Sequence, residues 1–147
     1  MKAVKNLMII DDDKLSNFIT SKLIGHSGLV KKVKKCYSAR IALRYLQQNC
    51  NNNTGEYPDI ILLDVSMYDM NGWEFIKEFE KLDKNYQSKI TIFILSNSIS
   101  DTDREISEHF SSIKDFFHKP LSIPMIQNMV SQLPSKQKIT IRVQPEL

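Results

Sequence analysis

The chain has 147 residues, 41% of them apolar and 25% charged, with a net charge of +3, a balance typical of one globular domain. Its longest apolar runs, such as 60–63 and 92–95, are far too short to span a bilayer. The brief apolar start runs directly into three aspartates and has no signal-peptide cleavage site. We therefore expect a cytoplasmic protein that does not bind membranes.

Strand-like and helix-like segments alternate along the chain. The apolar spacing predicts strands at 7–10, 31–37, 59–63, 90–95 and 113–117, and helices at 14–24, 39–48, 73–82, 101–110 and 123–133. The third strand is preceded by a polar, asparagine-rich loop. Strands that are apolar throughout are buried on both faces, and parallel strands need right-handed crossovers. The fold class is therefore α/β: a doubly wound, five-stranded parallel sheet in a three-layer sandwich of the (βα)5 type.

The periodicity also predicts which side of each early helix is buried. Asp13 or Ser16 is the candidate cap of the first helix, and Gly25 is its expected end. The side chains expected to face the core in the first two helices are Leu15, Phe18, Ile19, Leu23, Ile24, Ile41, Ala42, Tyr45 and Leu46.

Two segments favour simple interpretations over functional ones. The lysine cluster at 31–35 is typical of a solvated edge strand, because lysines oppose edge-to-edge pairing, so we do not expect nucleic-acid binding. The domain is expected to cover 1–134 and to be followed by a flexible tail at 135–147. Alternating Ile139, Ile141 and Val143 leave a short strand as the alternative for that tail.

Polar side chains follow the predicted strands where each one ends. Asp11 and Asp12 follow the first strand, Asp64 the third, Ser96 the fourth, and Lys119 the fifth. The carboxyl ends of parallel strands meet at one edge of the sheet, which is where ligands bind in such folds. Two carboxylates about 4 Å apart repel by roughly 4 kcal/mol at an effective dielectric of 20, so these need a cation or a shared proton.

The residue types favour a magnesium and phosphoryl site. Oxygen ligands without histidine or cysteine suit Mg²⁺. Mg²⁺ and the Lys119 ammonium would neutralise phosphoryl oxygens, and Ser96 would donate a hydrogen bond to one of them. An aspartate can itself be the nucleophile and form an acyl phosphate. Asp64 is the best candidate, because the third strand is expected to be central.

The same residues, in this order and spacing, resemble the receiver domain of two-component response regulators, the CheY-like family. The resemblance covers Asn6 to about Leu133. The segments that carry it are Met8–Asp12, Ile61–Asp64, Met70–Gly72, Ile94–Ser96 and Lys119–Pro120.

The resemblance implies a role for each acidic residue. Asp64 would accept a phosphoryl group from a phosphohistidine of a sensor histidine kinase or a histidine phosphotransfer protein. Asp64, Asp12, the backbone carbonyl of Ser66, and Asp11 largely through a water molecule would hold the Mg²⁺ cofactor. Such a protein is a phosphoacceptor that catalyses only its own phosphorylation and dephosphorylation, not an enzyme with a separate substrate.

The resemblance also implies a switch. Lys119 would pair with the phosphoryl group, and its bond to Pro120 would be cis. Ser96 would move toward a phosphoryl oxygen, and Phe116 would then turn inward. The surface of the fourth helix, fifth strand and fifth helix would change shape and dock a downstream protein partner. We expect a single-domain regulator.

Some positions differ from the family pattern. Tyr68 stands where proline is common, Asn97 where alanine or glycine is usual, and Phe116 where tyrosine is common. The loop would be less rigid, the phosphoryl pocket more crowded, and the two states of the switch less sharply separated.

Two alternatives stay open at this point. One is a phosphatase of the haloacid-dehalogenase type with Asp11 as its nucleophile. It needs an acidic pair after Lys119, where only Glu146 follows, and it gives Asp64 no role. The other is a receiver-like binding module that is never phosphorylated.

Overall fold

The sheet has the predicted parallel, doubly wound arrangement. The structure, a computed structural model, describes residues 4–134, so the predicted tail at 135–147 and its alternating Ile139, Ile141 and Val143 lie outside the described residues. The strand order is β2-β1-β3-β4-β5, and every pair is parallel. The strands are β1 (Val4–Ile10), β2 (Val30–Cys36), β3 (Ile60–Leu63), β4 (Thr91–Ser96) and β5 (Ile113–His118).

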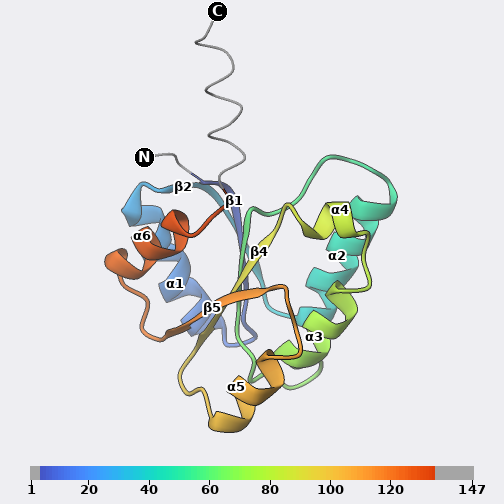
Figure 1. Cartoon of the computed structure of the whole chain (residues 1–147). Helices are drawn as coiled ribbons and strands as arrows, with labels where there is room; N and C mark the ends of the chain where they lie inside the picture. Colours follow the sequence, from blue (N-terminus) through green and yellow to red (C-terminus); the bar gives the residue numbers. More distant parts are fainter. Residues whose placement is uncertain (1–3, 135–147) are drawn as a thin grey trace, which may run out of the picture.

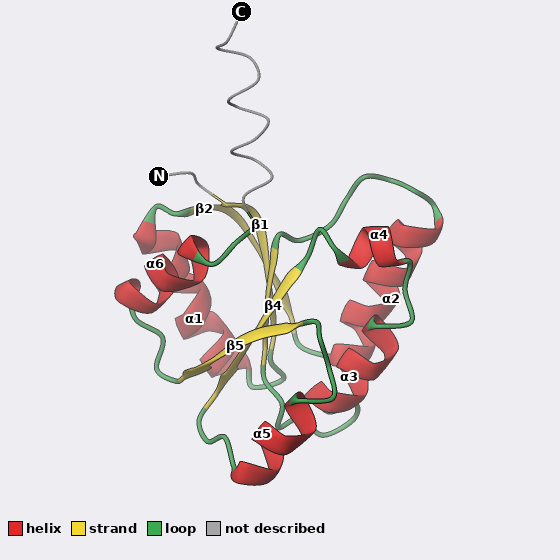
Figure 2. Ribbon diagram, in the orientation of Figure 1, coloured by secondary structure: helices red, strands yellow, loops and turns green. Residues whose placement is uncertain are grey.

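Helices cover both faces of the sheet, as Figures 1 and 2 show. α1 and α6 lie on one face, and α2 and α3 lie on the other. No helix between residues 4 and 134 is both long and apolar enough to cross a membrane. The helices are α1 (Lys14–Ser27), α2 (Ala39–Asn51), α3 (Gly72–Phe79), α4 (Lys84–Gln87), α5 (Asp101–Ser107) and α6 (Ile123–Ser131).

Two apolar cores lie on opposite faces of the sheet. Alternate side chains of β1 point to opposite sides, so Met8 and Ile10 join the core under α2 and α3. Leu7 and Ile9 join the core under α1 and α6. β3 and the run Ile92–Leu95 of β4 are buried on both faces, which explains why these segments are apolar throughout. This packing fixes the direction in which the polar residue after each strand is presented.

Two expectations about the helices were wrong. The side chains of Leu15, Phe18 and Ile19 are 67%, 50% and 54% exposed. Ile24 is buried as expected, but the residues buried with it in α1 are Asn17 and Thr20. Ile41 of α2 is also exposed. Both stripes of α1 have helical spacing, so periodicity alone could not choose between them. The choice follows from Asn17, which bonds to backbone carbonyls at the ends of the first two strands.

Element boundaries also moved. Asp13 caps the start of α1, but the helix continues past Gly25 to Ser27 and ends at Gly28, which has a positive φ of 72°. The prediction had no counterpart of α4, because its four residues are too few to show a helical period.

The lysine-rich strand lies where the prediction placed it. β2 is an edge strand, and Lys31, Lys32, Lys34 and Lys35 are exposed. The prediction of a charged, solvated edge is therefore confirmed.

Candidate functional site

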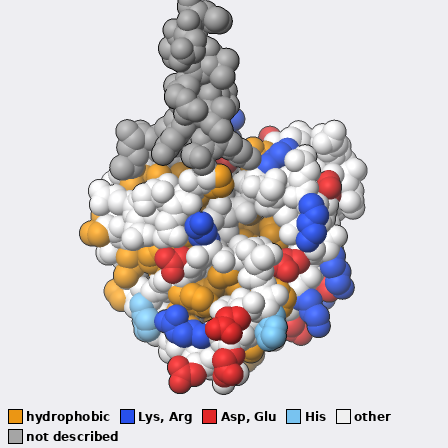
Figure 3. All heavy atoms as spheres, in the orientation of Figure 1, with side chains coloured by type: hydrophobic (Ala, Val, Ile, Leu, Met, Phe, Trp, Pro, Cys, Tyr) orange, Lys and Arg blue, Asp and Glu red, His pale blue; other side chains and the backbone are white. Residues whose placement is uncertain are grey.

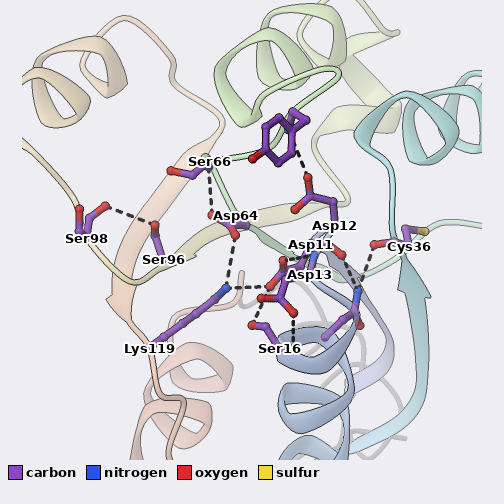
Figure 4. Close-up of polar contacts among 12 residues, drawn as sticks. Asp11, Asp12, Asp13, Ser16, Cys36, Asp64, Ser66, Ser96, Ser98 and Lys119 are labelled. Carbon is purple, nitrogen blue, oxygen red and sulfur yellow. Dashed lines mark hydrogen bonds and ion pairs between the residues drawn. The ribbon is translucent and has the colours of Figure 1, made fainter.

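Three charged side chains converge at the carboxyl edge of the sheet. β1 and β3 are neighbours in register, with Ile10 opposite Leu63, so Asp11 and Asp64 leave the two strands side by side. Lys119, which follows β5, reaches both of them (Figure 4). The topology thus gathers residues that are far apart in the chain, as the sequence predicted.

Lys119 bridges the two carboxylates. Its Nζ donates to Asp11 Oδ2 at 2.7 Å and to Asp64 Oδ2 at 3.3 Å, and its side chain is 10% exposed. Burial alone would lower the pKa of this ammonium, but hydrogen bonds and opposite charges from both aspartates outweigh burial and raise the pKa. The Lys119–Pro120 peptide bond is cis, the isomer that the resemblance implied. The lysine therefore stays charged and holds the two acids together.

Asp64 combines partial burial with partial access. Its side chain is 11% exposed, and its Oδ1 accepts a hydrogen bond from the Ser66 N–H at 3.0 Å. Burial raises the pKa of this carboxyl, and the Ser66 N–H and the Lys119 charge only partly oppose that rise. A partly desolvated carboxylate is more basic than one in water, which suits a nucleophile.

Asp11 is more buried than Asp64 and accepts more hydrogen bonds. Its side chain is 2% exposed, and it accepts bonds from the Asp13 N–H at 3.0 Å and from Ser16 Oγ at 2.9 Å, in addition to Lys119. The sequence offered Ser16 only as a candidate helix cap, so this contact was missed. A hydroxyl in the first helical turn after an acidic pair is the signal that could have found it.

Asp12 is oriented differently. Its Oδ2 accepts a hydrogen bond from the Tyr68 N–H at 3.2 Å, so its carboxylate faces the loop between β3 and α3. Within residues 4–134, no three acidic, histidine or cysteine side chains lie close enough together to hold a metal ion. The donor set of Asp11, Asp12 and Asp64 contains oxygen atoms only, which fits Mg²⁺ chemically. In this arrangement the single positive charge of Lys119 pairs with both Asp11 and Asp64, so one negative charge stays uncompensated.

A cavity of about 560 Å³ lies over the site. Asp64, Asp12, Lys119 and Ser96 line it, whereas Asp11 is not among its lining residues. Asn97 also lines it. The cavity therefore gives a small ligand access to Asp64 and not to Asp11.

The two predicted switch residues lie apart from the acidic cluster. Ser96 is buried, and its Oγ donates to the Ser98 carbonyl at 3.3 Å, away from Asp64 (Figure 4). Phe116 is half-buried, and the guanidinium of Arg104 lies over its ring at 5.2 Å from the centroid. The structure thus places Ser96 at the cavity without directing its hydroxyl to Asp64.

The loop that carries Ser66 and Tyr68 is fixed from two sides. A bidentate ion pair joins Asp69 to Arg40 of α2, with distances of 2.9 and 3.3 Å. At the far end Gly72 packs so closely that a Cβ there would lie 2.6 Å from the Cα of Val65. No sequence pattern pointed to Arg40, because a lone arginine on a helix is usually solvated.

Several solved structures share this fold. A two-component response regulator from Cytophaga hutchinsonii is 25% identical, with a TM-score of 0.81 over 89% of this chain and 97% of that one. A response regulator receiver protein from Dyadobacter fermentans DSM 18053 is 29% identical, with a TM-score of 0.77 over 87% and 96%. The receiver domain of histidine kinase CKI1 from Arabidopsis thaliana, complexed with Mg²⁺, is 21% identical, with a TM-score of 0.71 over 87% and 90%. The chain spans 12% to 25% of the length of the curated relatives that it matches.

The sequence also matches a family model over most of its length. The model described as response regulator receiver domain matches residues 7–131. This range contains all the residues that form the acidic cluster, its lysine and the cavity. The chain therefore belongs to the response regulator receiver domain family.

Proposed function

We propose that Asp64 accepts a phosphoryl group from a phosphohistidine of a sensor histidine kinase or a histidine phosphotransfer protein. A carboxylate oxygen of Asp64 attacks phosphorus, so an O–P bond forms while the N–P bond breaks and the imidazole leaves. The observation that carries this proposal is access: Asp64 lines the cavity, whereas Asp11 is 2% exposed and has three hydrogen-bond donors on its carboxylate.

Mg²⁺ is the proposed cofactor. Asp11, Asp12, Asp64 and the carbonyl oxygen of Ser66 would hold it. Asp12 Oδ2 accepts the Tyr68 N–H, whereas Asp12 Oδ1 accepts no hydrogen bond within residues 4–134. When bound, the ion supplies positive charge that stabilises the oxygens of the transferring phosphoryl group. The oxygen-only donor set supports this choice, and so does the Mg²⁺ complex of the CKI1 receiver domain.

Lys119 and Ser96 are the proposed phosphoryl-binding side chains. Lys119 already contacts Asp64, and Ser96 lines the same cavity as these two residues, which supports the assignment. Ser96 Oγ now donates its hydrogen bond to the Ser98 carbonyl, and it must give up that bond before it can donate to a phosphoryl oxygen.

The proposed switch passes from Ser96 to Phe116. An inward turn of the Phe116 ring would break its contact with Arg104 of α5, and so alter the α5, β5 and α6 surface. Acidic side chains gather over α5 in the space-filling view (Figure 3), next to this surface. We propose that a downstream protein partner reads the altered surface.

Intact-mass measurement tests the acceptor. The protein is incubated with a small acyl phosphate and Mg²⁺, alongside Asp64→Asn and the control Asp101→Asn at an exposed position of α5. We expect one added phosphoryl group in the wild type and in the control, and none in Asp64→Asn.

Two other outcomes would change the conclusion. A gain that persists in Asp64→Asn would refute the assignment and return Asp11 as the nucleophile. No gain in the wild type with the small donor or with a phosphorylated histidine phosphotransfer protein would favour a binding module that signals without phosphorylation.

A further inference from the structure

A buried asparagine links the ends of the first two strands. Asn17 of α1 is fully buried, and its Nδ2 donates to the carbonyl oxygens of Asp11 and Cys36, both at 3.1 Å. The Cys36 carbonyl also accepts the Asp11 N–H at 3.1 Å. One side chain therefore ties α1, β1 and β2 together where the acidic pair begins.

This contact acts on the peptide bond between Asp11 and Asp12. That bond is planar, so fixing the direction of the Asp11 carbonyl also fixes the direction of the Asp12 N–H and the position of the Asp12 Cα. The Asp11 carboxylate has three donors of its own, but the Asp12 carboxylate has only the Tyr68 N–H within the described part of the chain. The backbone therefore largely determines where the Asp12 carboxylate can reach.

The Asn17 side chain also carries a cost to folding. Its Oδ1 is buried and has no hydrogen-bond partner within residues 4–134. A buried polar atom without a partner destabilises the folded state, which offsets part of what the two donated bonds contribute. A residue chosen for stability alone would not carry this penalty. The side chain instead suits a geometric task at the end of β1.

We propose that Asn17 is a positioning residue for the divalent cation. By orienting the Asp11–Asp12 peptide, it sets the reach of the Asp12 carboxylate and with it the affinity for Mg²⁺. This inference rests on the proposed function, because it assumes that Asp12 is a metal ligand. Residues that orient ligands in this way commonly change metal affinity by about 10- to 100-fold when they are removed.

The test uses Asn17→Leu, which keeps the approximate size of the side chain and removes both donated bonds. The matched control is Thr20→Val, which alters another buried polar side chain of α1, one turn away from the strand ends that Asn17 joins. Mg²⁺ affinity is measured by calorimetry, and stability is measured by urea unfolding without metal. Asn17→Ser, whose hydroxyl is too short to hold both carbonyls, serves as a second variant if Asn17→Leu does not fold.

We expect both Asn17 variants to bind Mg²⁺ at least about tenfold more weakly, while Thr20→Val binds as the wild type does. In metal-free protein the amide resonance of Asp12 should shift in the Asn17 variants and stay in place in Thr20→Val. Wild-type affinity in the Asn17 variants would overturn the inference and leave the proposed function intact. A wild type that binds no Mg²⁺ would remove the proposed function, and the inference with it.

Discussion

Replacing Gly72 by alanine should destabilise the protein, although alanine is the better helix former. Gly72 is the first residue of α3, and a Cβ there would lie 2.6 Å from the Cα of Val65 and 3.0 Å from the carbonyl oxygen of Asp64. Both are backbone atoms, so no side-chain rotation relieves the overlap. Overpacking of this kind costs about 1–3 kcal/mol, which exceeds the gain in helix propensity of about 0.5–1 kcal/mol.

Gly25 provides a control of opposite sign. It lies inside α1, and nothing is within 4 Å of the Cβ that alanine would add. Gly25→Ala should therefore stabilise the protein by about 0.5–1 kcal/mol. Urea unfolding of both variants against the wild type measures the two effects. A Gly72→Ala protein as stable as the wild type would refute the close packing of α3 against the residue that follows Asp64.

Three further predictions concern the charge, the cap and the metal. Burial raises the pKa of Asp64 in the folded state, so Asp64 favours folding at acid pH, where its carboxyl is protonated, and this stabilisation is lost as the pH rises through the folded-state pKa. Asp64→Asn, which stays neutral, should therefore be more stable than the wild type in urea at pH 7. The difference should vanish well below pH 4. Asn71→Ala removes the cap whose Oδ1 accepts the Glu74 N–H at 2.9 Å, and should cost about 1 kcal/mol in the same assay. Mg²⁺ at about 100 times its Kd should add about 2.7 kcal/mol to the unfolding free energy measured in urea, and Asp12→Asn should lose that gain.

The strands and the residues that follow them were predictable because two constraints coincide. Central parallel strands must be apolar on both faces, so β3 and β4 stand out in the sequence. The first polar residue after each strand then lies at the edge where ligands bind, so the sequence pattern alone predicts that Asp11, Asp64 and Lys119 meet there. Fold and candidate site follow from the same physical constraint.

What the sequence did not reveal depends on contacts between distant residues. The buried side of α1 was mistaken because Asn17 is turned inward by the carbonyl oxygens of Asp11, just after β1, and of Cys36 in β2, a preference that no hydrophobicity pattern records. The hydrogen bond from the Tyr68 N–H to Asp12 and the ion pair between Arg40 and Asp69 arise only when the loop after β3 meets its neighbours. A polar residue is assigned to a surface by pattern, and only the three-dimensional arrangement shows that it has buried partners.

The distances at the site bear on how the proposed switch would work. Lys119 is closer to Asp11, at 2.7 Å, than to Asp64, at 3.3 Å, so the acid that is proposed to react is the less tightly paired of the two. A phosphoryl group on Asp64 would add negative charge there and draw the ammonium toward it. Ser96 would exchange one bond of 3.3 Å for a charge-assisted one. Phosphorylation can shift the equilibrium between the outward and inward orientations of Phe116 only by the difference between these contacts in the two states. The contact between Phe116 and Arg104 stabilises the outward orientation and so opposes the shift. Removing the Arg104 guanidinium would then favour the inward orientation of the Phe116 ring even before phosphorylation.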